Sequence, residues 1–324
     1  MFPIVFFSHP KISGFCHKFR LWKHSNHPDG LSKEILSLVD PKIIEQVLNE
    51  CYVWIHSERN RDIQLVSIYD SEYPGYLKEI YDPPLVLAVR GNKEVLKKDL
   101  ISIVGTRKAS PISRLATKLI IEKLKSENAN LAIVSGMALG IDRETFVSAL
   151  ELGIPVLGVL GTCMDQEYPP GNRDLYKKVK EDPNSCLVTE FVLKTEPAKW
   201  TFPKRNRVIS GLSLHVYIME SGKKSGTIST AMSALSQNRE IHVFDHPLQS
   251  DNSGGKNLLN DGANPIFWEE IAANKGWIHY PQERGDGKTI GFADWKKEKD
   301  CEREFLRERN TTPLGRGAHW ISIL

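Results

Sequence analysis

An arginine directly after a glycine turn is the first arrangement of residues in this chain that could bind an anion. The residues of Ile101–Val104 suit a buried strand, Gly105, Thr106 and Arg107 end that strand, and a helical pattern begins at Pro111. The start of a helix offers free backbone N–H groups and a positive dipole end, and a guanidinium matches a phosphate as a two-pronged donor. This turn is therefore a candidate phosphate site. The alternative is an ordinary strand-to-helix turn with a solvated arginine.

Turns of small residues also follow other apolar stretches. Ser135–Asp142 reads SGMALGID, Gly161–Asp165 reads GTCMD, and Glu220–Thr227 reads ESGKKSGT. Asp142 is placed where a helix N-cap would accept a backbone hydrogen bond. Several such turns at one edge of a sheet would form an extended groove of backbone donors, which favours an anionic ligand. The alternative is that the glycines only permit tight turns and close packing of helix on strand.

The stretch Lys199–Arg207 interleaves cations with aromatic rings. Its cations are Lys199, Lys204, Arg205 and Arg207, and its rings are Trp200 and Phe202. Cations that follow phosphates and rings that stack on bases are typical of surfaces that bind single strands, with roughly 1–3 kcal/mol per stacked base. The alternative for the same residues is a solvated loop with one buried ring.

The elements that must position these residues alternate along the chain between apolar strands and helices. Strands are predicted at Leu85–Val89, Ile101–Val104, Leu131–Val134, Pro155–Leu160, Cys186–Val188, Leu214–Met219 and Ile241–Phe244, and helices around 113–125, 142–152, 172–180 and 226–237. Continuously apolar strands separated by helices indicate an α/β fold, a Rossmann-like parallel sheet with helices on both faces. Ligands of such sheets bind at the carboxyl ends of the strands, where these turns are expected.

Composition is that of an ordinary globular protein. The 324 residues are 40% hydrophobic and 26% charged, and the net charge of +3 neither demands nor excludes a polyanionic partner. The sequence has no run of about eighteen apolar residues, so we predict no membrane span. Five scattered cysteines without a CxxC pair favour a reducing, cytoplasmic location. We interpret the apolar start MFPIVFFSHPK as a strand or packed arm, not as a secretion signal.

Motifs that would indicate catalysis or a cofactor are missing from the sequence. Lys223-Lys224-Ser225 resembles the end of a phosphate-loop motif, but the glycine five residues before the lysine is absent, and GTRKAS does not match GxGxxG. His242 and His246 flank a strand end, where their spacing does not bring both to one metal. We find no nucleophile–base pair. The prediction is a protein that is not an enzyme and has no cofactor and no metal.

Breaks in composition divide the chain into three predicted parts. Residues 1–65 are a helical N-terminal segment, in which apolar residues recur at helical spacing between Ser37 and His56. Residues 66–269 are the Rossmann-like domain, which begins with an aromatic- and proline-rich stretch. Residues 270–324 are a C-terminal tail of unclear fold, and its balanced charges in Trp295–Arg309 are typical of a solvated helix.

Together these motifs resemble one protein family. In chain order they are Gly105-Thr106-Arg107, SGMALGID at 135–142, Tyr168-Pro169 with Asn172, FPKRNR at 202–207, Ser225-Gly226-Thr227 with Thr230-Ala231, and Gly255, Asn257 and Gly262-Ala263; the YP…DPP stretch at 73–84 fits as well. Their order and spacing, over about residues 66–266, are similar to those of the DNA-processing protein A family (DprA, also called Smf). Each motif alone is loose, but six in this order are specific.

The resemblance implies a homodimer without enzymatic activity that binds and protects single-stranded DNA. Such a protein helps to load the bacterial recombinase in natural transformation and DNA recombination. By the same resemblance Arg107 would hold a phosphate, Lys199 would contact the DNA backbone, and Phe202 would stack on a base. Arg205 and Arg207 would extend the basic surface, unless one of them is buried. The other predicted groove residues are Gly105, Thr106, Ser135, Gly136, Ser225, Gly226 and Thr227.

The sequence departs from the family pattern in two places. Phe146 stands where the family commonly has a histidine, four residues after the aspartate of GID, and an apolar residue on a helix that faces the sheet packs easily there. Residues 270–324 are short for the winged-helix domain that many members carry. We expect no winged helix there, and partner contacts attributed to that domain are not transferred to this chain.

Two other functions would use the same groove. A nucleotide hydrolase of the lysine-decarboxylase-like type has a related sheet and a PGGxGTxxE turn, but here its carboxylate position is Thr230. A hydroxyl at that position does not ionise near neutral pH to act as a base. A nucleotide sensor would bind a small ligand in place of a strand, and titration with mononucleotides separates it from a DNA-binding protein.

Overall fold

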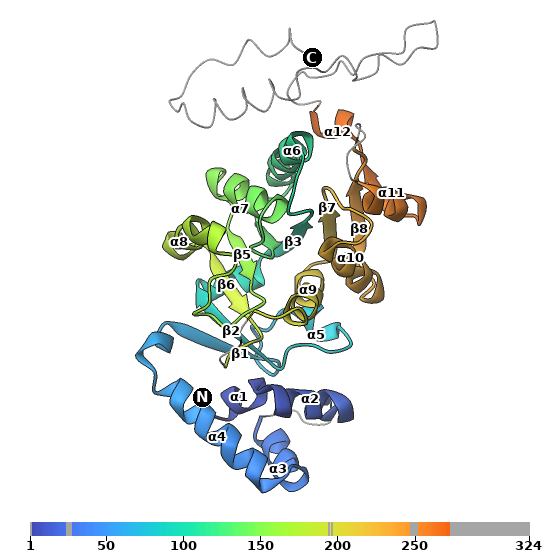
Figure 1. Ribbon diagram of the computed structural model, residues 1–324. Helices are drawn as coiled ribbons and strands as arrows, with labels where there is room; N and C mark the ends of the chain where they lie inside the picture. The colour runs from blue at the N-terminus through green and yellow to red at the C-terminus, as the bar shows by residue number, and fades with distance from the viewer. Residues whose placement is uncertain (1, 24–27, 194, 196, 247–251, 273–324) are drawn as a thin grey trace, which may run out of the picture.

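A sheet of nine strands forms the centre of the computed structural model, which describes residues 2–23, 28–193, 195, 197–246 and 252–272 (Figure 1). The strands are β1 (Ile63–Ser67), β2 (Val86–Gly91), β3 (Asp99–Val104), β4 (Leu131–Ser135), β5 (Val156–Val159), β6 (Cys186–Thr189), β7 (His215–Ile218), β8 (Glu240–Phe244) and β9 (Asn264–Ile266). Their order is β1-β2-β6-β5-β4-β3-β7-β8-β9. In this spatial order every neighbouring pair from β6 through β5, β4, β3, β7 and β8 to β9 is parallel, whereas β2 is antiparallel to both β1 and β6.

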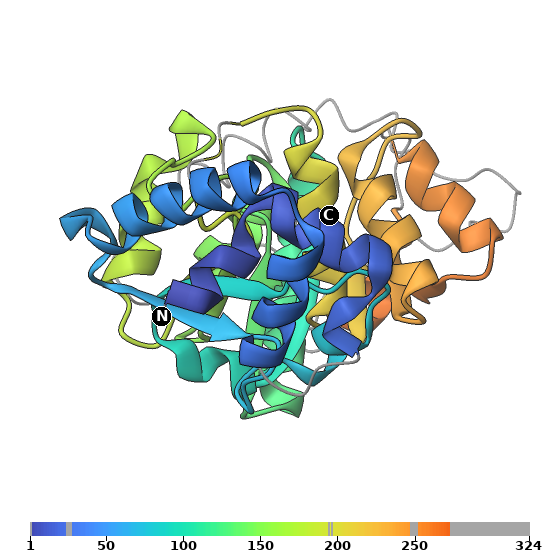
Figure 2. The same cartoon turned by 90° about the horizontal axis from the view of Figure 1, so that it is seen from below.

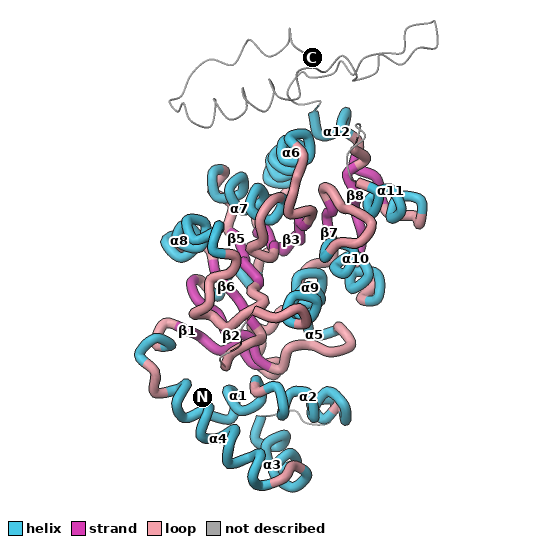
Figure 3. Tube along the Cα trace, viewed as in Figure 1, coloured by secondary structure: helices cyan, strands magenta, loops and turns pink. Residues whose placement is uncertain are grey.

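Helices cover both faces of this sheet (Figures 1 and 3). They are α1 (Phe2–Ser8), α2 (Pro10–Phe19), α3 (Pro28–Leu38), α4 (Pro41–Ile55), α5 (Gly75–Glu79), α6 (Pro111–Glu127), α7 (Ile141–Glu151), α8 (Arg173–Glu181), α9 (Thr201–Gly211), α10 (Gly226–Ser236), α11 (Ser253–Asn260) and α12 (Trp268–Ala272). Helix α6 packs against α7 and α12 beside one face, and α9 packs against α5 and α10 beside the other. The predicted α/β Rossmann-like class is confirmed.

The predicted elements of the Rossmann-like part agree with the structure except at one helix. All seven predicted strands and the four predicted helices lie on observed ones, because their apolar residues are the buried residues of the sheet and its cover. The alternative in which Lys199–Arg207 is a solvated loop is wrong, since Thr201–Gly211 forms α9. In this stretch Phe202, Arg205 and Ile209 recur at a spacing of three and four residues, a helical period that the charges obscured.

Of the two interpretations of the N-terminal residues, a strand or a packed arm, the strand is wrong. Phe2–Ser8 forms α1, and its residues Val5, Phe6 and Phe7 are buried. Helix α1 packs against α2, α3 and α4 and against the β1–β2 edge of the sheet. Seen from below in Figure 2, these first helices lie together across one end of the molecule. Strand β1 spans the predicted boundary at residue 65, and the division into three parts stays a prediction.

The order of the strands in the sheet changes direction at β3: β4, β5 and β6 lie on one side of it, and β7, β8 and β9 lie on the other. Strand β3 pairs with β4 on one side and with β7 on the other, so strands that follow in sequence lie first to one side and later to the other. The carboxyl ends of β3, β4 and β7 therefore meet at a topological switch point, where open α/β sheets bind ligands. The core beneath this point is closely packed, and every residue of β4 is buried.

The predicted C-terminal tail, residues 270–324, lies outside the described residues apart from the last three residues of α12. Its fold stays a prediction. In the part of the chain that the structure describes, no helix combines the length and the apolar character needed to cross a lipid bilayer.

Candidate nucleic-acid interface

An open pocket of about 370 Å³ lies at the switch point, between the end of β3 and the N-termini of α9 and α10. From the predicted set it brings together Gly105, Thr106, Arg107, Phe202, Arg205, Ser225, Gly226 and Thr227. Val104, Ala138, Asp142, Pro203, Asn206, Ile209 and Thr230 complete the lining. The pocket thus combines backbone-rich turns, an exposed guanidinium and one aromatic ring.

The turn after β3 is fixed on both sides. The Thr106 N–H donates to the Glu220 carbonyl at 2.8 Å, and the Thr106 carbonyl accepts from the Ile141 N–H at 3.1 Å. A Cβ on Gly105 would lie 2.5 Å from Cγ1 of Ile141, so only glycine allows α7 to approach this closely. Arg107, next in the turn, is exposed and lines the pocket. The turn therefore has a backbone that is hydrogen-bonded on both sides, and it presents the exposed Arg107 side chain to the pocket.

Phe202 forms an apolar wall at the N-terminus of α9. Its ring lies 5.2 Å from that of Tyr168, with the two planes tilted by 38°. It also lies so close to Gly161 that a Cβ there would be 2.9 Å from its Cδ1. Phe202 is only partly buried, and Tyr168 is exposed. Together these rings form a partly open aromatic surface beside Arg107, of a kind on which a nucleobase stacks.

Arg205 and Asp142 form the floor of the pocket. Arg205 is 5% exposed, and its Nη1 donates to the carbonyls of Gly136 and, at 2.8 Å, Val159. Asp142 Oδ2 accepts from the N–H groups of Gly136 at 3.1 Å and Ala138 at 3.3 Å. Burial raises the pKa of the Asp142 carboxyl, and the charge of Arg205 opposes that rise. The floor is thus a tightly bonded unit that links the β4, β5 and α9 segments.

The prediction that Asp142 is a helix N-cap is wrong. Gly140 is the N-cap of α7, with φ of 75°, and Asp142 lies within the first turn. Its side chain turns back to the loop after β4, where it binds two N–H groups ahead of the helix. In the first turn of α7 the Asp142 carboxylate is also stabilised by the positive end of the helix dipole.

The start of α10 forms the opposite wall. Ser225 is the N-cap of α10, and its Oγ accepts from the Ile228 N–H at 3.4 Å. Gly226 has no neighbour within 4 Å of the place where a Cβ would be. Thr227 and Thr230 lie on the pocket side of the same helix. The first turn of α10 therefore lines the pocket, and the start of a helix is a place where anions bind.

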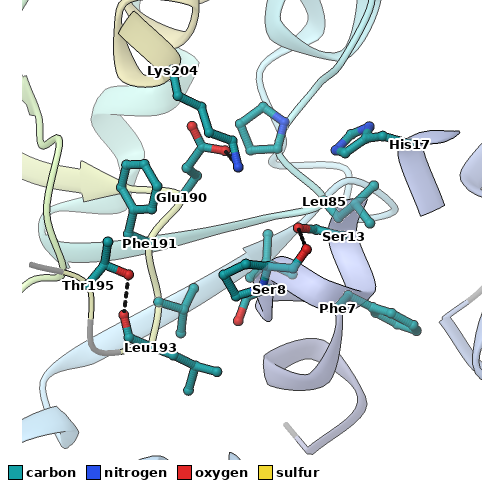
Figure 4. A pocket seen from close by; sticks show the side chains of 14 residues that line it. Phe7, Ser8, Ser13, His17, Leu85, Glu190, Phe191, Leu193, Thr195 and Lys204 are labelled. Atoms are coloured by element: carbon teal, nitrogen blue, oxygen red, sulfur yellow. Dashed lines mark hydrogen bonds and ion pairs between the residues drawn. The ribbon is translucent and has the colours of Figure 1, made fainter. Parts of the chain in front are cut away.

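The two arginines predicted to extend the basic surface are both buried, which corrects that prediction. Arg205 supports the floor of the pocket as described above. Arg207 lies on the other side of α9, where Nε is 2.7 Å from Asp82 Oδ2 and Nη1 is 2.8 Å from Glu190 Oε1. Lys204 also contacts Glu190. Figure 4 shows Lys204 and Glu190 pointing toward one another at the junction with α1 and α2. An arginine with two carboxylate partners inside the protein has no free donor fork for a phosphate.

Three other predicted residues lie outside the pocket. Ser135 is buried, and its Oγ donates to the Ile103 carbonyl at 2.6 Å. Gly136 is buried behind Arg205, so the expectation that it lines the groove is wrong. Lys199 is exposed, three residues before Phe202, and does not line the pocket. A contact of Lys199 with DNA would extend beyond the pocket, and it stays a prediction.

Sequence reasoning missed two residues that organise the site. Asn206 follows Arg205 in the FPKRNR motif, and its Nδ2 donates to the Gly226 carbonyl at 3.1 Å, which joins α9 to α10. Glu220 ends the apolar run of β7, and its carboxylate accepts from the N–H of Ser110 at 2.8 Å. A polar residue at the end of a buried strand, on the ligand edge of the sheet, was the available signal for Glu220.

No arrangement typical of a metal site occurs among the residues that the structure describes. Nowhere in those ranges do three or more histidine, cysteine, aspartate or glutamate side chains come together so that they could hold an ion. His242 instead contacts His215, and His246 contacts Ser110.

Comparison with known proteins places this geometry in a family. The family model of DNA recombination-mediator protein A matches residues 64–274. The DNA processing protein DprA of Bacillus subtilis is 35% identical over 216 residues, which cover 65% of this chain and 71% of that protein. The DprA structure from Streptococcus pneumoniae, at 27% identity and a TM-score of 0.62, covers 78% of this chain and 83% of its own.

A structure of DNA processing protein A from Helicobacter pylori, described for its single-stranded DNA binding mode, is also similar. It has 26% identity and a TM-score of 0.57, and the match covers 67% of this chain and 97% of that one. The family model matches well over half of the chain, and its range includes every residue of the pocket. The chain therefore belongs to the DNA recombination-mediator protein A family.

Proposed function

We propose that this protein binds single-stranded DNA at the switch-point pocket and acts in DNA processing during natural transformation and recombination. One observation carries the proposal: the exposed Arg107, the partly open ring of Phe202 and the N-terminal turn of α10 border the same pocket. A guanidinium and helix N–H groups fit phosphates, and the ring fits a base. This combination suits a flexible strand whose bases are accessible.

The related proteins support the same function. The Helicobacter pylori structure is described by its single-stranded DNA binding mode, and the Bacillus subtilis and Streptococcus pneumoniae relatives are DNA processing proteins. The matched range runs from residue 64 to 274, so we place DNA binding in the predicted Rossmann-like domain, residues 66–269. Lys199, exposed before α9, would contact the DNA backbone where the strand leaves the pocket.

We further propose that the pocket binds its ligand without hydrolysing it. Thr230 stands where a nucleotide hydrolase would carry its carboxylate, and its Oγ1 donates to the Gly226 carbonyl. The carboxylate in the lining, Asp142, accepts two backbone N–H groups with one oxygen and lies beside Arg205. Both groups are engaged in holding the walls of the pocket, so neither is placed as a general base.

The proposed partners beyond DNA are the bacterial recombinase and a second copy of the chain, in the cytoplasm. Helix α10 leaves Met232 55% exposed and Leu235 64% exposed, which supports a protein contact on this helix. Light scattering of the purified chain, with and without Leu235→Glu, tests the homodimer.

Fluorescence anisotropy with oligonucleotides of matched sequence tests DNA binding. The proposal predicts that a single strand binds more tightly than the duplex, and that the affinity for the single strand falls steeply with salt. Mononucleotides at millimolar concentration should compete poorly. Equal affinity for duplex and single strand, or saturation of the pocket by a mononucleotide with release of a free base, would overturn the proposal.

A further inference from the structure

One residue holds both ends of the loop that carries the exposed cations Arg107 and Lys108. At the start of the loop, the Glu220 carbonyl accepts from the Thr106 N–H at 2.8 Å. At its end, Glu220 Oε2 accepts from the Ser110 N–H at 2.8 Å and from the Ser110 Oγ at 2.9 Å. Both ends of the loop are thereby held by a single residue, Glu220, which follows the neighbouring strand β7; its backbone holds one end and its side chain the other.

The Glu220 carboxylate faces the interior and not the pocket. Glu220 is 4% exposed and does not line the pocket, whereas Arg107 does both: it is exposed and it lines the pocket. A buried carboxylate close to a phosphate site would repel the anion and weaken its binding. Hydrogen bonds from neighbouring donors to the carboxylate reduce this repulsion. Here it accepts two hydrogen bonds from Ser110, and such bonds are stronger when the acceptor is charged.

A third group supports this arrangement from the segment that follows β8. His246 is 4% exposed, and its Nε2 lies 3.0 Å from the Ser110 Oγ. The same hydroxyl accepts from the Ser113 N–H at 3.2 Å as the N-cap of α6. Since the hydroxyl has one proton, which it gives to Glu220, the imidazole donates to it. The end of the loop is thus joined to β7, β8 and α6 together.

We infer that Glu220 is the positioning residue of the phosphate-binding loop and contributes to DNA binding through Arg107 and Lys108 without touching DNA. This inference rests on the proposed function. A loop fixed before binding loses less conformational entropy when Arg107 engages a phosphate, so part of the affinity depends on the clamp. The side-chain end of the clamp is at Ser110, because the carbonyl end at Thr106 is independent of the side chain.

A double-mutant cycle separates positioning from general support of the fold. We compare the parent chain with Glu220→Ala, Arg107→Ala/Lys108→Ala and the triple variant, by anisotropy on one single-stranded oligonucleotide at moderate salt. Glu220→Ala should weaken binding about five- to tenfold in the parent, and less than about twofold once both cations are gone. Lys199 lies outside the loop. In a variant that carries both Glu220→Ala and Lys199→Ala, the loss of affinity should therefore be the product of the two separate fold-losses.

Two further variants keep the test decisive. Glu220→Gln retains a carbonyl oxygen that can accept from Ser110 and should restore binding to within about twofold of the parent. Should Glu220→Ala fold poorly by thermal melting, Ser110→Ala takes its place in the cycle. It removes the Oγ bond to Glu220 together with the Oγ bonds to His246 and the Ser113 N–H, and it keeps the backbone N–H bond of residue 110 to Glu220. An equal loss from Glu220→Ala with and without the loop cations, or no loss in the parent, would overturn the inference. A parent chain that does not bind the oligonucleotide at all would instead overturn the proposed function.

Discussion

Arg207 and Glu190 form a buried two-pronged ion pair, with Nη1 2.8 Å from Oε1 and Nη2 2.9 Å from Oε2. The pair lies on the side of α9 opposite to Phe202 and Arg205. Helix α9 therefore carries the wall and floor of the pocket on one side and an ion-pair cluster at the N-terminal helices on the other. This arrangement indicates that Arg207 stabilises the fold. Arg205, two residues earlier in the same motif, instead supports the floor of the pocket.

Replacement of Arg207 by methionine should destabilise the fold without removing a DNA contact. Breaking a buried ion pair leaves Glu190 without its strongest partner, so the free energy of unfolding should fall by about 3–5 kcal/mol. Urea titration followed by circular dichroism measures the loss. The matched control is Arg61→Met, at a side chain that is 76% exposed, which should change stability by less than about 0.5 kcal/mol. A stable Arg207→Met protein that has lost DNA binding would contradict this assignment.

The ring of Phe202 should contribute a stacking interaction. Phe202→Ala should weaken binding of a single strand by about 1–3 kcal/mol, or roughly 5- to 150-fold. Phe202→Tyr keeps a ring in the same place and should bind nearly as well as the parent. Anisotropy titrations of both variants measure the difference. Equal losses for alanine and tyrosine would mean that the ring packs without stacking on DNA.

The two glycines of the pocket should respond differently to a methyl group. In Gly105→Ala the new Cβ would meet Ile141 Cγ1 at 2.5 Å, and this overpacking should lower stability by about 1–3 kcal/mol. Gly226 has open space around it, so Gly226→Ala should change stability by less than about 0.5 kcal/mol. Thermal melting compares the two. A large loss from Gly226→Ala would contradict the open environment at the start of α10.

The junction between α2 and the sheet should make stability depend on pH. Burial, with a smaller effect of the nearby Arg207 charge, lowers the pKa of His17 to about 4 from the ordinary 6.5. Between these values the unfolded chain binds a proton that the folded chain does not, so stability is lost as pH falls from 6.5 toward 4. Urea midpoints over this range should fall less for His17→Phe than for the parent. Parallel curves for the two proteins would show that His17 stays solvated.

Most of the fold could be predicted from local pattern. Strands such as Leu131–Val134 are continuously apolar because both faces of the sheet are covered, and helices such as α6 have a proline and a serine cap at their start. The pattern was less informative for α9, where lysine and arginine residues suggested a solvated loop. The apolar run near the N-terminus did not distinguish a strand from a helix, because nearly every position is apolar and no period is visible.

The candidate site could be predicted at the level of its turns but not of its side-chain directions. Gly105, Arg107 and Ser225 were found because glycine turns at strand ends converge by topology, and Phe202 was found because its stretch interleaves cations with rings. The burial of Arg205 and Arg207 could not be read from the sequence, because it depends on partners far along the chain, such as Gly136 and Glu190. An arginine looks the same in sequence whether it faces phosphate or carboxylate.

The most direct test of the central claim is the salt dependence of single-strand binding by the parent, Arg107→Ala and Arg61→Ala proteins. If Arg107 holds a phosphate in the pocket, its loss should reduce the slope of log K against log salt by about 0.7, the value for one phosphate of a single strand. Arg61→Ala removes an equally charged, exposed side chain outside the pocket and should leave the slope unchanged. Identical slopes and affinities for the parent and Arg107→Ala proteins would contradict the account.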